Sequence, residues 1–582
     1  METRKRIVDS ARGDQPFDLV LQSVQLVNVL THEIYPADIG ITGERIALVA
    51  PAGRFDLRTK EKMDCQGLWA VPGFIDGHVH NESSMTTPAR WAEAILPEGT
   101  TTVCTDPHEI GNVLGLEGVR YMLQASQGLP LRYYVTAPSC VPAVPHLESA
   151  GAVFTAQEVA EMLRWERVIA VAEAMDFVGL AHQVGNITAI AEAGQQAEVP
   201  VEGHAPMVSE RLLQAYLAAA GPRASDHESL SADNMIEKAR AGCLIYARVN
   251  PTLDTTQEVV QAMSQVEDKR MFGMCTDDNA PNHILQNGHM NYGMRSLISA
   301  GVDPVTVIQM ATINVANHYG LWGLGAIAPG WLADIVLLDD LQQVRVRHVI
   351  TSGKLRVKDG ALLTPIEEPV KPRLENSVHL PADLSVESFL PQVEGREACR
   401  VHALNLSNLI NTQLESLELP CQNGRVRFPL PEGVSLAAVV GRHGQGNPPS
   451  LAFITGYPLQ SGAVASTVSH DSHNLVIIGK TPEDMFAAAQ ALAQSGGGLV
   501  ALREGRVIAE IKLPIAGLMS PLPLPEIAQQ VTHFEQSLPE LGLMPYFPWH
   551  ILALALPVIP QVRLTDLGLA NTTTQQFIPM QA

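Results

Sequence analysis

The chain has 582 residues, too many for a single hydrophobic core, which predicts about two to four domains. Its 39 Lys and Arg residues against 61 Asp and Glu residues give a net charge of −22, spread along the sequence. This charge argues against nucleic acid or an anionic membrane as a partner, and we expect a small-molecule ligand instead.

The N-terminus and the cysteines restrict the cellular setting and the kind of metal site. Residues 1–18 are charged and lack the apolar segment of a signal peptide, and the apolar run at residues 551–559 is too short to span a bilayer. We therefore predict a cytoplasmic protein without a membrane partner. The seven cysteines are scattered and form no CxxC pair, so any metal should be held by nitrogen and oxygen ligands.

Two short β-rich segments flank a long central region. Residues 17–50 alternate apolar and polar positions as short strands do, and the same style returns at residues 333–358. Neither segment should be stable alone, so we expect both to pair in one small β-sandwich domain. We place its two parts at residues 1–70 and 331–375.

The central region, residues 71–330, alternates strand-like apolar runs with segments of helical spacing. The runs include VPGFID, TTTVCTD, RYYVTAPS, VIAVAEAM, VPVEGHAP, ASDHES and MFGMCTDD. Strands that alternate with helices indicate a parallel sheet, and about 260 residues is the usual size of a (β/α)8 barrel of the TIM type. The predicted fold class is therefore α/β.

A third region follows a connector rich in Pro and Glu at residues 365–380. Residues 376–582 mix strand and helix patterns and are predicted to form an α+β domain, with a helix that begins near Thr481 and ends at Gly496. The stretch HDSHN, residues 470–474, is predicted to be a polar loop between two strands. It could hold a second metal, approach the mouth of the barrel or contact a neighbouring subunit.

Two histidines one residue apart follow the first strand-like run of the central region. Residues two apart on a strand point to the same face, so His78 and His80 present two imidazoles together. By themselves they are as compatible with a hydrogen-bonded polar loop as with half of a metal site.

Four later runs each end in a polar residue able to bind a metal, namely Glu173, His204, His227 and Asp277. The carboxyl ends of barrel strands converge on one face, so these side chains should meet the two histidines. Four imidazoles and two carboxylates exceed one tetrahedral site and suit two divalent ions bridged by a carboxylate and a hydroxide. Donors of this kind favour zinc, iron(II) or manganese.

Longer strings in the sequence are more specific than this pattern of ligands. In GHVHNESSM, TDPHEIGNV, MATINVANHYGL and GAIAPGWLADIVLLD, and in GRHGQGN and EIKLPIAGLMS further on, the chain resembles the amidohydrolase superfamily and, within it, the bacterial adenine deaminase family. The resemblance spans nearly the whole chain. It implies hydrolytic deamination of adenine to hypoxanthine and ammonia by a hydroxide between two metals, a step of purine salvage.

The resemblance also implies how the metals are bound. Two divalent ions per subunit, Mn²⁺ or Fe²⁺ with Zn²⁺ as the alternative, would be held by His78, His80 and Asp277 at one ion, by His204 and His227 at the other, and by Glu173 between them. Glu173 stands where many superfamily members carry a carbamylated Lys. Asp277 would also carry the proton of the hydroxide to the departing amine.

An acid with a raised pKa should lie close to ring nitrogen N1 of the substrate, because protonation there makes C6 more electrophilic. Glu82, just after HVH, is the first candidate for this catalytic role. Asp106, His108 and Glu109 of TDPHE are further candidates for substrate binding. Ordinary structural explanations exist as well, since Asp106 could cap a turn before Pro107 and Glu109 could lie in the first turn of a helix.

Two other functions stay open. The barrel could carry another amidohydrolase activity, that of a cyclic-amide hydrolase or a deacetylase, or the chain could be a non-catalytic assembly protein. The second is disfavoured because every ligand position is kept. We expect the partners to be adenine and further copies of the chain in a homo-oligomer, a dimer or a tetramer.

Overall fold

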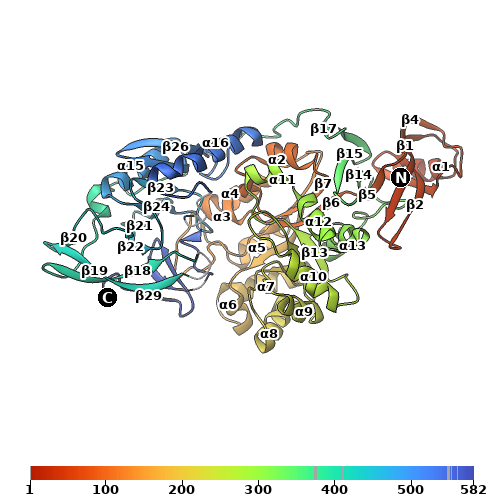
Figure 1. Cartoon of the computed structure of the whole chain (residues 1–582). Coiled ribbons are helices and arrows are strands. Elements are labelled where there is room, and N and C mark those ends of the chain that lie inside the picture. The colour runs from red at the N-terminus through yellow and green to blue at the C-terminus, as the bar shows by residue number, and fades with distance from the viewer. Residues whose placement is uncertain (1, 372–375, 409–411, 547–550, 552, 560) are drawn as a thin grey trace.

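The computed structural model describes residues 2–371, 376–408, 412–546, 551, 553–559 and 561–582. Residues 372–375 of the predicted connector and residue 552 of the apolar run at residues 551–559 lie outside the described residues. Figure 1 shows three parts in a row, with the N-terminal strands at the right, the central region in the middle and the C-terminal region at the left.

Strands from both flanks of the central region form one sheet, in the order β17, β16, β15, β14, β5, β1, β2, β3, with β4 paired to β1. The flanks meet where β14 (Ile335–Asp340) pairs antiparallel with β5 (Trp69–Pro72). The expected pairing of the two flanks is therefore present, while the sandwich form and the boundaries at residues 70 and 331 stay predictions. The other elements here are α1 (Glu2–Ala11), β1 (Phe17–Asn28), β2 (Glu33–Thr42), β3 (Arg45–Pro51), β4 (Thr59–Asp64), β15 (Arg345–Thr351), β16 (Lys354–Lys358) and β17 (Ala361–Leu362).

The central region contains parallel strands in two hydrogen-bonded sheets, one of five strands from β6 to β10 and one of three from β11 to β13. Single parallel bridges join Val201 to Ala224 and Val79 to Asp277, so the two sheets curl toward each other at both edges. This arrangement agrees with a barrel of the TIM type. The strands are β6 (Phe74–Val79), β7 (Thr100–Thr105), β8 (Arg132–Ala137), β9 (Val168–Ala174), β10 (Val201–Gly203), β11 (Ser225–Asp226), β12 (Leu244–Arg248) and β13 (Phe272–Cys275).

The interior of the ring is packed with side chains. Ile75 of β6, Ala170 of β9 and Tyr246 of β12 belong to one buried cluster, which strands on different sides of the ring can share only through its interior. Gly77 in β6 lacks a side chain because its Cβ would lie 2.3 Å from the Tyr246 ring. The closed interior leaves the carboxyl ends of the strands as the place for a site.

Helices follow most of the barrel strands, as the alternating pattern predicts. They are η1 (Asn81–Ser84), α2 (Pro88–Ile95), α3 (His108–Leu114), α4 (Leu116–Ala125), α5 (Ala156–Met162), α6 (Phe177–His182), α7 (Asn186–Gln196), α8 (Glu210–Ala220), α9 (Ala232–Arg240), α10 (Thr256–Gln265), α11 (Pro281–Asn287), α12 (Met290–Ser299), α13 (Pro304–Met310) and α14 (Ile313–Tyr319). Within the described residues, no helix of the protein has both the length and the apolar character needed to cross a membrane.

The C-terminal region is built on a mixed sheet in the order β20, β19, β18, β22, β21, β24, β23, β25, β26. Helix α15 (Pro482–Ser495) begins after Thr481, whose hydroxyl accepts the Asp484 N–H at 3.2 Å, and it ends at Gly496 with φ 80°. Both ends agree with the sequence expectation. The sheet strands are β18 (Ala398–Asn405), β19 (Gln413–Gln422), β20 (Arg425–Val426), β21 (Ser435–Val440), β22 (Ser450–Thr455), β23 (Ala463–Ser466), β24 (Leu475–Gly479), β25 (Gly498–Arg503) and β26 (Arg506–Lys512).

Smaller elements complete this region. They are η2 (Val386–Phe389), α16 (Leu524–Ser537), η3 (Leu538–Leu541), β27 (Val562–Thr565), β28 (Gly568–Asn571) and β29 (Gln576–Ile578). Strands and helices are thus mixed here, in keeping with the α+β pattern of the sequence.

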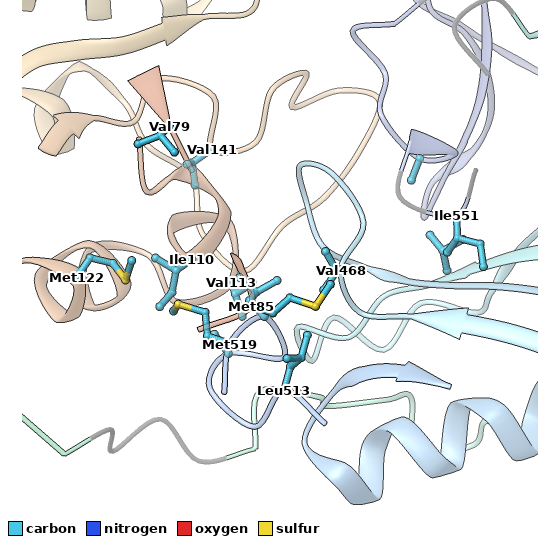
Figure 2. Packing of buried hydrophobic residues seen from close by; sticks show 14 of the residues in the cluster. Val79, Met85, Ile110, Val113, Met122, Val141, Val468, Leu513, Met519 and Ile551 are labelled. Carbon is cyan, nitrogen blue, oxygen red and sulfur yellow. The ribbon is translucent and has the colours of Figure 1, made fainter. Parts of the chain in front are cut away.

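The C-terminal region packs against the segments that follow β6 and β7. One buried cluster holds Met85 and Ile110 from these segments together with Val468 and Met519 of the C-terminal region (Figure 2). The backbone N–H of Ser520 also donates to the Met85 carbonyl at 2.9 Å. Because both segments lie at the carboxyl ends of parallel strands, the C-terminal region covers part of the barrel mouth.

Candidate metal centre

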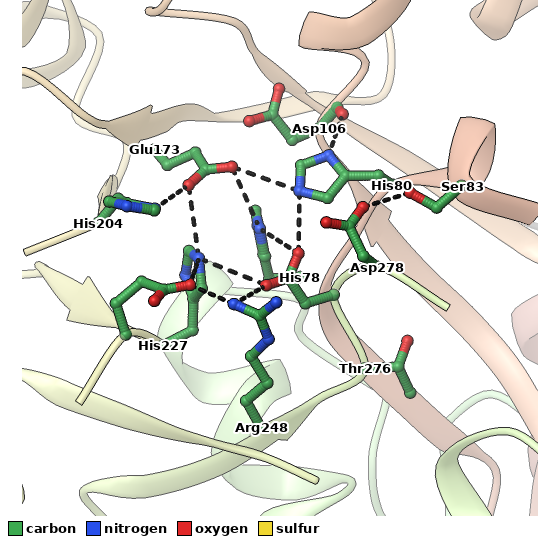
Figure 3. A network of polar contacts seen from close by, with 12 residues as sticks. His78, His80, Ser83, Asp106, Glu173, His204, His227, Arg248, Thr276 and Asp278 are labelled. Carbon is green, nitrogen blue, oxygen red and sulfur yellow. Dashed lines mark hydrogen bonds and ion pairs between the residues drawn. The ribbon is translucent and has the colours of Figure 1, made fainter. Parts of the chain in front are cut away.

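Six buried or largely buried side chains meet at the carboxyl ends of the barrel strands (Figure 3). Two of them come from β6 and its end, one comes from β9, and three lie one or two residues after the ends of β10, β11 and β13. In chain order they are His78, His80, Glu173, His204, His227 and Asp277. The structure therefore brings together all six residues that the sequence pattern selected.

Glu173 lies at the centre of the group, and each of its oxygens faces two imidazoles. Its Oε1 is 3.5 Å from His78 Nε2 and 3.3 Å from His80 Nε2. Its Oε2 is 2.8 Å from His204 Nδ1 and 3.4 Å from His227 Nε2. A carboxylate placed in this way between two pairs of imidazoles can bridge two cations.

Asp277 closes the group from the side of β13. Its Oδ1 lies 3.1 Å from His80 Nε2 and 3.9 Å from His78 Nε2, and its Oδ2 lies 3.9 Å from His227 Nε2. Its backbone has φ 55°, in the left-handed region that costs a non-glycine residue about 1 kcal/mol or more. Such strain is often found at functional positions.

The donor set fits divalent cations. Candidate ligand atoms lie within 4.8 Å of one another in the set His78, His80 and Asp277 and in the set His78, Glu173 and His227. Across the described residues, the buried Nε2 of His78 finds no hydrogen-bond partner. The Nδ1 of His80 lies 3.0 Å from the carbonyl oxygen of Asp106, which leaves Nε2 of His80 free to bind a metal.

The charges of the group match this chemistry. Burial raises the pKa of Glu173, but the imidazoles of His78, His204 and His227 lower it by more than burial raises it. The net pKa of Glu173 therefore lies well below the usual range. Burial lowers the pKa of His227, but the Glu173 carboxylate raises it to about 9. Ionised carboxylates that hold protonated imidazoles are the arrangement in which cations can replace protons.

Arg248, at the end of β12, is a residue of the site that the sequence analysis does not single out. Its Nη1 lies 2.5 Å from Asp277 Oδ2, and it also pairs with Glu228. Burial raises the pKa of Asp277, but Arg248 and His80 bring it well below the usual range. The signal was available, because LIYAR is an apolar run that ends in a polar residue, as the other barrel strands do.

Glu82 lies in η1, just beyond the first two histidines. Its Oε1 accepts the Ile110 N–H at 3.3 Å, while its buried Oε2 has no hydrogen-bond partner in the described part of the chain. Burial, and after it the nearby Glu109 carboxylate, raises the pKa of Glu82 to about 7. These are the surroundings expected of an acid that is protonated near neutral pH.

The TDPHE residues combine structural contacts with proximity to the centre. Asp106 Oδ1 accepts the His108 N–H at 3.1 Å, which is the expected turn, and Asp106 Oδ2 lies 2.9 Å from His108 Nδ1. That ring nitrogen is also 3.6 Å from Glu173 Oε1. Glu109 lies in the first turn of α3, as expected, but its carboxylate faces away from solvent and is 2 % exposed.

The HDSHN loop joins β23 to β24, as predicted, and of its three possible roles the structure shows an approach to the barrel mouth. His470 Nδ1 lies 2.9 Å from Glu109 Oε1, and His473 Nε2 contacts Glu109 Oε2. Asp471 Oδ1 lies 3.6 Å from His108 Nε2. A loop of the C-terminal region therefore reaches side chains that surround the candidate metal centre.

Comparison with known proteins shows that both large regions match known families. Residues 69–356 match the family described as "Amidohydrolase family", and residues 409–576 match "Adenine deaminase C-terminal domain". "Adenine deaminase 2" of Carboxydothermus hydrogenoformans is 38% identical over 585 residues, which cover 100% of both chains. "Adenine deaminase" of Moorella thermoacetica is 38% identical over 586 residues, which cover 100% of this chain and 98% of that one.

Solved structures resemble the chain more distantly. A β-aspartyl dipeptidase from Fervidobacterium islandicum has a TM-score of 0.46 and 17% sequence identity, and it covers 60% of this chain and 98% of its own. An adenosine deaminase from Xanthomonas campestris with bound zinc has a TM-score of 0.45 and 15% identity, and it covers 60% of this chain and 95% of its own.

Proposed function

The chain belongs to the adenine deaminase family of the amidohydrolases, and from this premise we propose that it converts adenine and water to hypoxanthine and ammonia. The observation that carries the reaction type is the convergence of His78, His80, Glu173, His204, His227 and Asp277 at one face of the barrel. The choice of adenine as substrate is supported by relatives that are named adenine deaminase and that match this chain along its full length. The reaction is a step of purine salvage.

The six residues would hold two divalent ions, Mn²⁺ or Fe²⁺ with Zn²⁺ as the alternative, in the arrangement that the family resemblance implies. When bound, such ions supply Lewis acidity and a nucleophilic water at neutral pH. His78, His80 and Asp277 form one group of donors, His204 and His227 the other, and Glu173 lies between them. The four distances from the Glu173 oxygens to the imidazoles support this division.

Asp277 is proposed to move the proton. It is ionised, buried and in contact with His80, so it can take a proton from the attacking water and give it to the leaving amine. The contact with Arg248 fixes the orientation of its second oxygen. Departure of the protonated amine from C6 as ammonia then leaves the carbonyl of hypoxanthine.

Glu82 is proposed as the acid that holds a proton toward ring nitrogen N1 of adenine. Its free and buried Oε2 supports this role, because a protonated carboxyl there can donate a hydrogen bond to the ring. Asp106, His108 and Glu109 are proposed to line the pocket, with Asp106 orienting the His108 ring.

The experiment is to load the purified enzyme with manganese, iron(II) or zinc and to measure ammonia release from adenine, adenosine and 6-substituted purines. We expect two metal ions per chain and release of ammonia from adenine. Opening of dihydropyrimidine rings in place of adenine deamination would instead favour the cyclic-amide hydrolase activity. Well below one metal ion per chain in metal-replete enzyme would contradict an enzymatic function and favour the non-catalytic alternative.

A further inference from the structure

Buried polar atoms without a hydrogen bond gather where the HDSHN loop meets the TDPHE segment. Among the described residues, His108 Nε2, Asp471 Oδ2 and Glu82 Oε2 all lack a hydrogen-bond partner. The three side chains are at most 4 % exposed. Buried polar atoms are rarely left unpaired in native proteins, so atoms of this kind beside a metal centre indicate a place for a ligand.

The position of Asp471 fits the far end of a purine. The His108 ring lies between two carboxylates, with Nδ1 3.6 Å from Glu173 Oε1 and Nε2 3.6 Å from Asp471 Oδ1. Asp471 therefore lies across the His108 ring from Glu173, the carboxylate at the centre of the candidate metal ligands. A base whose C6 lies at the metals extends its second ring away from them, over a similar distance.

Among the carboxylates from the TDPHE segment and the loop, two have a buried oxygen without a hydrogen bond in the described residues, namely Glu109 Oε1 and Asp471 Oδ2. Glu109 already faces His470 and His473, which together approach both of its oxygens. Asp106 accepts the backbone N–H of His108 and contacts its ring. Asp471 Oδ2 has no comparable partner in the part of the chain that the structure describes.

Hydrogen bonds of Arg442 and Asn474 hold the loop that carries Asp471 in place. The guanidinium of Arg442 is fully buried and donates to backbone carbonyl groups, from Nε to His473 and from Nη2 to Ala516 at 3.0 Å. Asn474 Nδ2 donates to the Ser149 carbonyl of the barrel at 2.7 Å. Burial of a guanidinium carries a desolvation cost that these hydrogen bonds offset, so they indicate that the conformation of the loop is specified.

We propose that Asp471 is a substrate-binding residue, whose Oδ2 accepts a hydrogen bond from the N–H of the imidazole ring of adenine. The C-terminal region then selects the free base, because purines that carry a substituent on that ring nitrogen offer no N–H to the buried oxygen. A site built around such a bond rejects an analogue that lacks the donor, since a buried polar group is left unpaired. This inference rests on the proposed function and names the part of the pocket that reads the far ring.

The test measures binding of purine and its 9-methyl and 7-methyl derivatives to the metal-loaded enzyme by calorimetry. These probes lack the 6-amino group and are not deaminated, and the methylated ones have no ring N–H. We expect purine to bind the unmodified enzyme about 10- to 100-fold more tightly than the methylated purines, as a hydrogen bond to a charged group would give. In Asp471→Ala this difference should collapse, and Asp471→Asn, which keeps an acceptor oxygen, should lie between the two.

The same variants are compared in the reaction with adenine. Asp471→Ala should raise KM for adenine about 10- to 100-fold with a smaller effect on kcat, because the lost contact lies away from the reacting carbon. Asp484→Asn is the matched control, since the Asp484 carboxylate accepts the Gly505 N–H at 2.7 Å within the C-terminal region. It should leave KM and the purine preference unchanged.

Three results would overturn the inference. The first is an undiminished preference for purine over 9-methylpurine in Asp471→Ala. The second is equal affinity of the unmodified enzyme for all three probes, which decides the matter even if the variants fail to fold. The third is loss of a metal ion in the Asp471 variants, which would make Asp471 a ligand in the group that also contains His108 and Cys140. Failure of the unmodified enzyme to release ammonia from adenine would contradict the proposed function instead.

Discussion

At the scale of residues, the site depends on a glutamate that shares its two oxygens among four imidazoles. The pKa of Glu173 is held well below its usual range even though burial raises it, because His78, His204 and His227 lie so close. A side chain with one negative charge and two equivalent oxygens therefore suits this position. A neutral amide keeps neither the negative charge nor the pair of equivalent oxygens.

Replacement of Glu173 by Gln should deplete the metals. The amide keeps the shape of the side chain but removes the negative charge between the two groups of ligands, so we expect metal content to fall below two ions per chain. Elemental analysis of the purified variant measures this. Glu161→Gln is the control, since Glu161 pairs with Arg120 at the surface. Unchanged metal content in Glu173→Gln would mean that the bridging role is misassigned.

Replacement of Asp277 by Asn should separate catalysis from folding. The amide can still bind a cation through its oxygen but cannot accept a proton, so we expect kcat to fall by about 10²- to 10⁴-fold, the usual contribution of acid–base catalysis. Most of the metal should remain, as elemental analysis will show. The surface variant Asp268→Asn controls for unspecific effects. Near-normal turnover of Asp277→Asn would exclude the proton-transfer role.

At the scale of elements, the ends of strands and helices place the functional residues. Short strands such as β10 and β11 end directly before His204 and His227, so the change from strand to loop aims each imidazole at the centre. In the C-terminal region, β23 ends before the HDSHN loop, β24 begins directly after it, and α15 packs against both strands. The stability of α15 therefore bears on the loop.

Replacement of Thr481 by Ala should weaken the start of α15. The Thr481 hydroxyl accepts the N–H of Asp484, and loss of such an N-cap costs about 1 kcal/mol in the free energy of unfolding. Denaturant unfolding measures this cost, and hydrogen exchange should be faster in the first turn of α15. Thr573→Ala, in an exposed turn, serves as the control. Equal exchange rates in the two variants would show that the cap does not stabilise the helix.

At the scale of the whole molecule, the barrel and the C-terminal region share a core. Met519 is fully buried, and its cluster includes Met85, Ile110 and Val113 of the barrel (Figure 2). The shared core holds the HDSHN loop against the barrel mouth. We therefore expect the two regions to unfold together. The homo-oligomer and the cytoplasmic location stay predictions from the sequence.

Replacement of Met519 by Ala should lower the stability of both regions. Truncation of a buried Met to Ala costs about 2 to 5 kcal/mol in the free energy of unfolding. Calorimetry should show one transition at a lower Tm, whereas Met544→Ala, at a side chain that is 61% exposed, should leave the Tm unchanged. Two separate transitions, with that of the barrel unmoved, would contradict a shared core.

The sequence by itself determined the type of barrel and the six residues of the candidate metal centre. Both depend on local patterns, since apolar runs form strands and the residue after each run lies at the carboxyl end. The ends of α15 were predictable for the same reason. Arg248 was within reach of this pattern as well.

The tertiary structure alone decided where the HDSHN loop lies. His473 and Glu109 are in contact although 364 positions separate them in the chain. Such a contact depends on how two folded surfaces pack, and no local pattern of residues encodes it. The free oxygen of Asp471 and the coverage of the barrel mouth became visible for the same reason, because the shared core brings distant segments together.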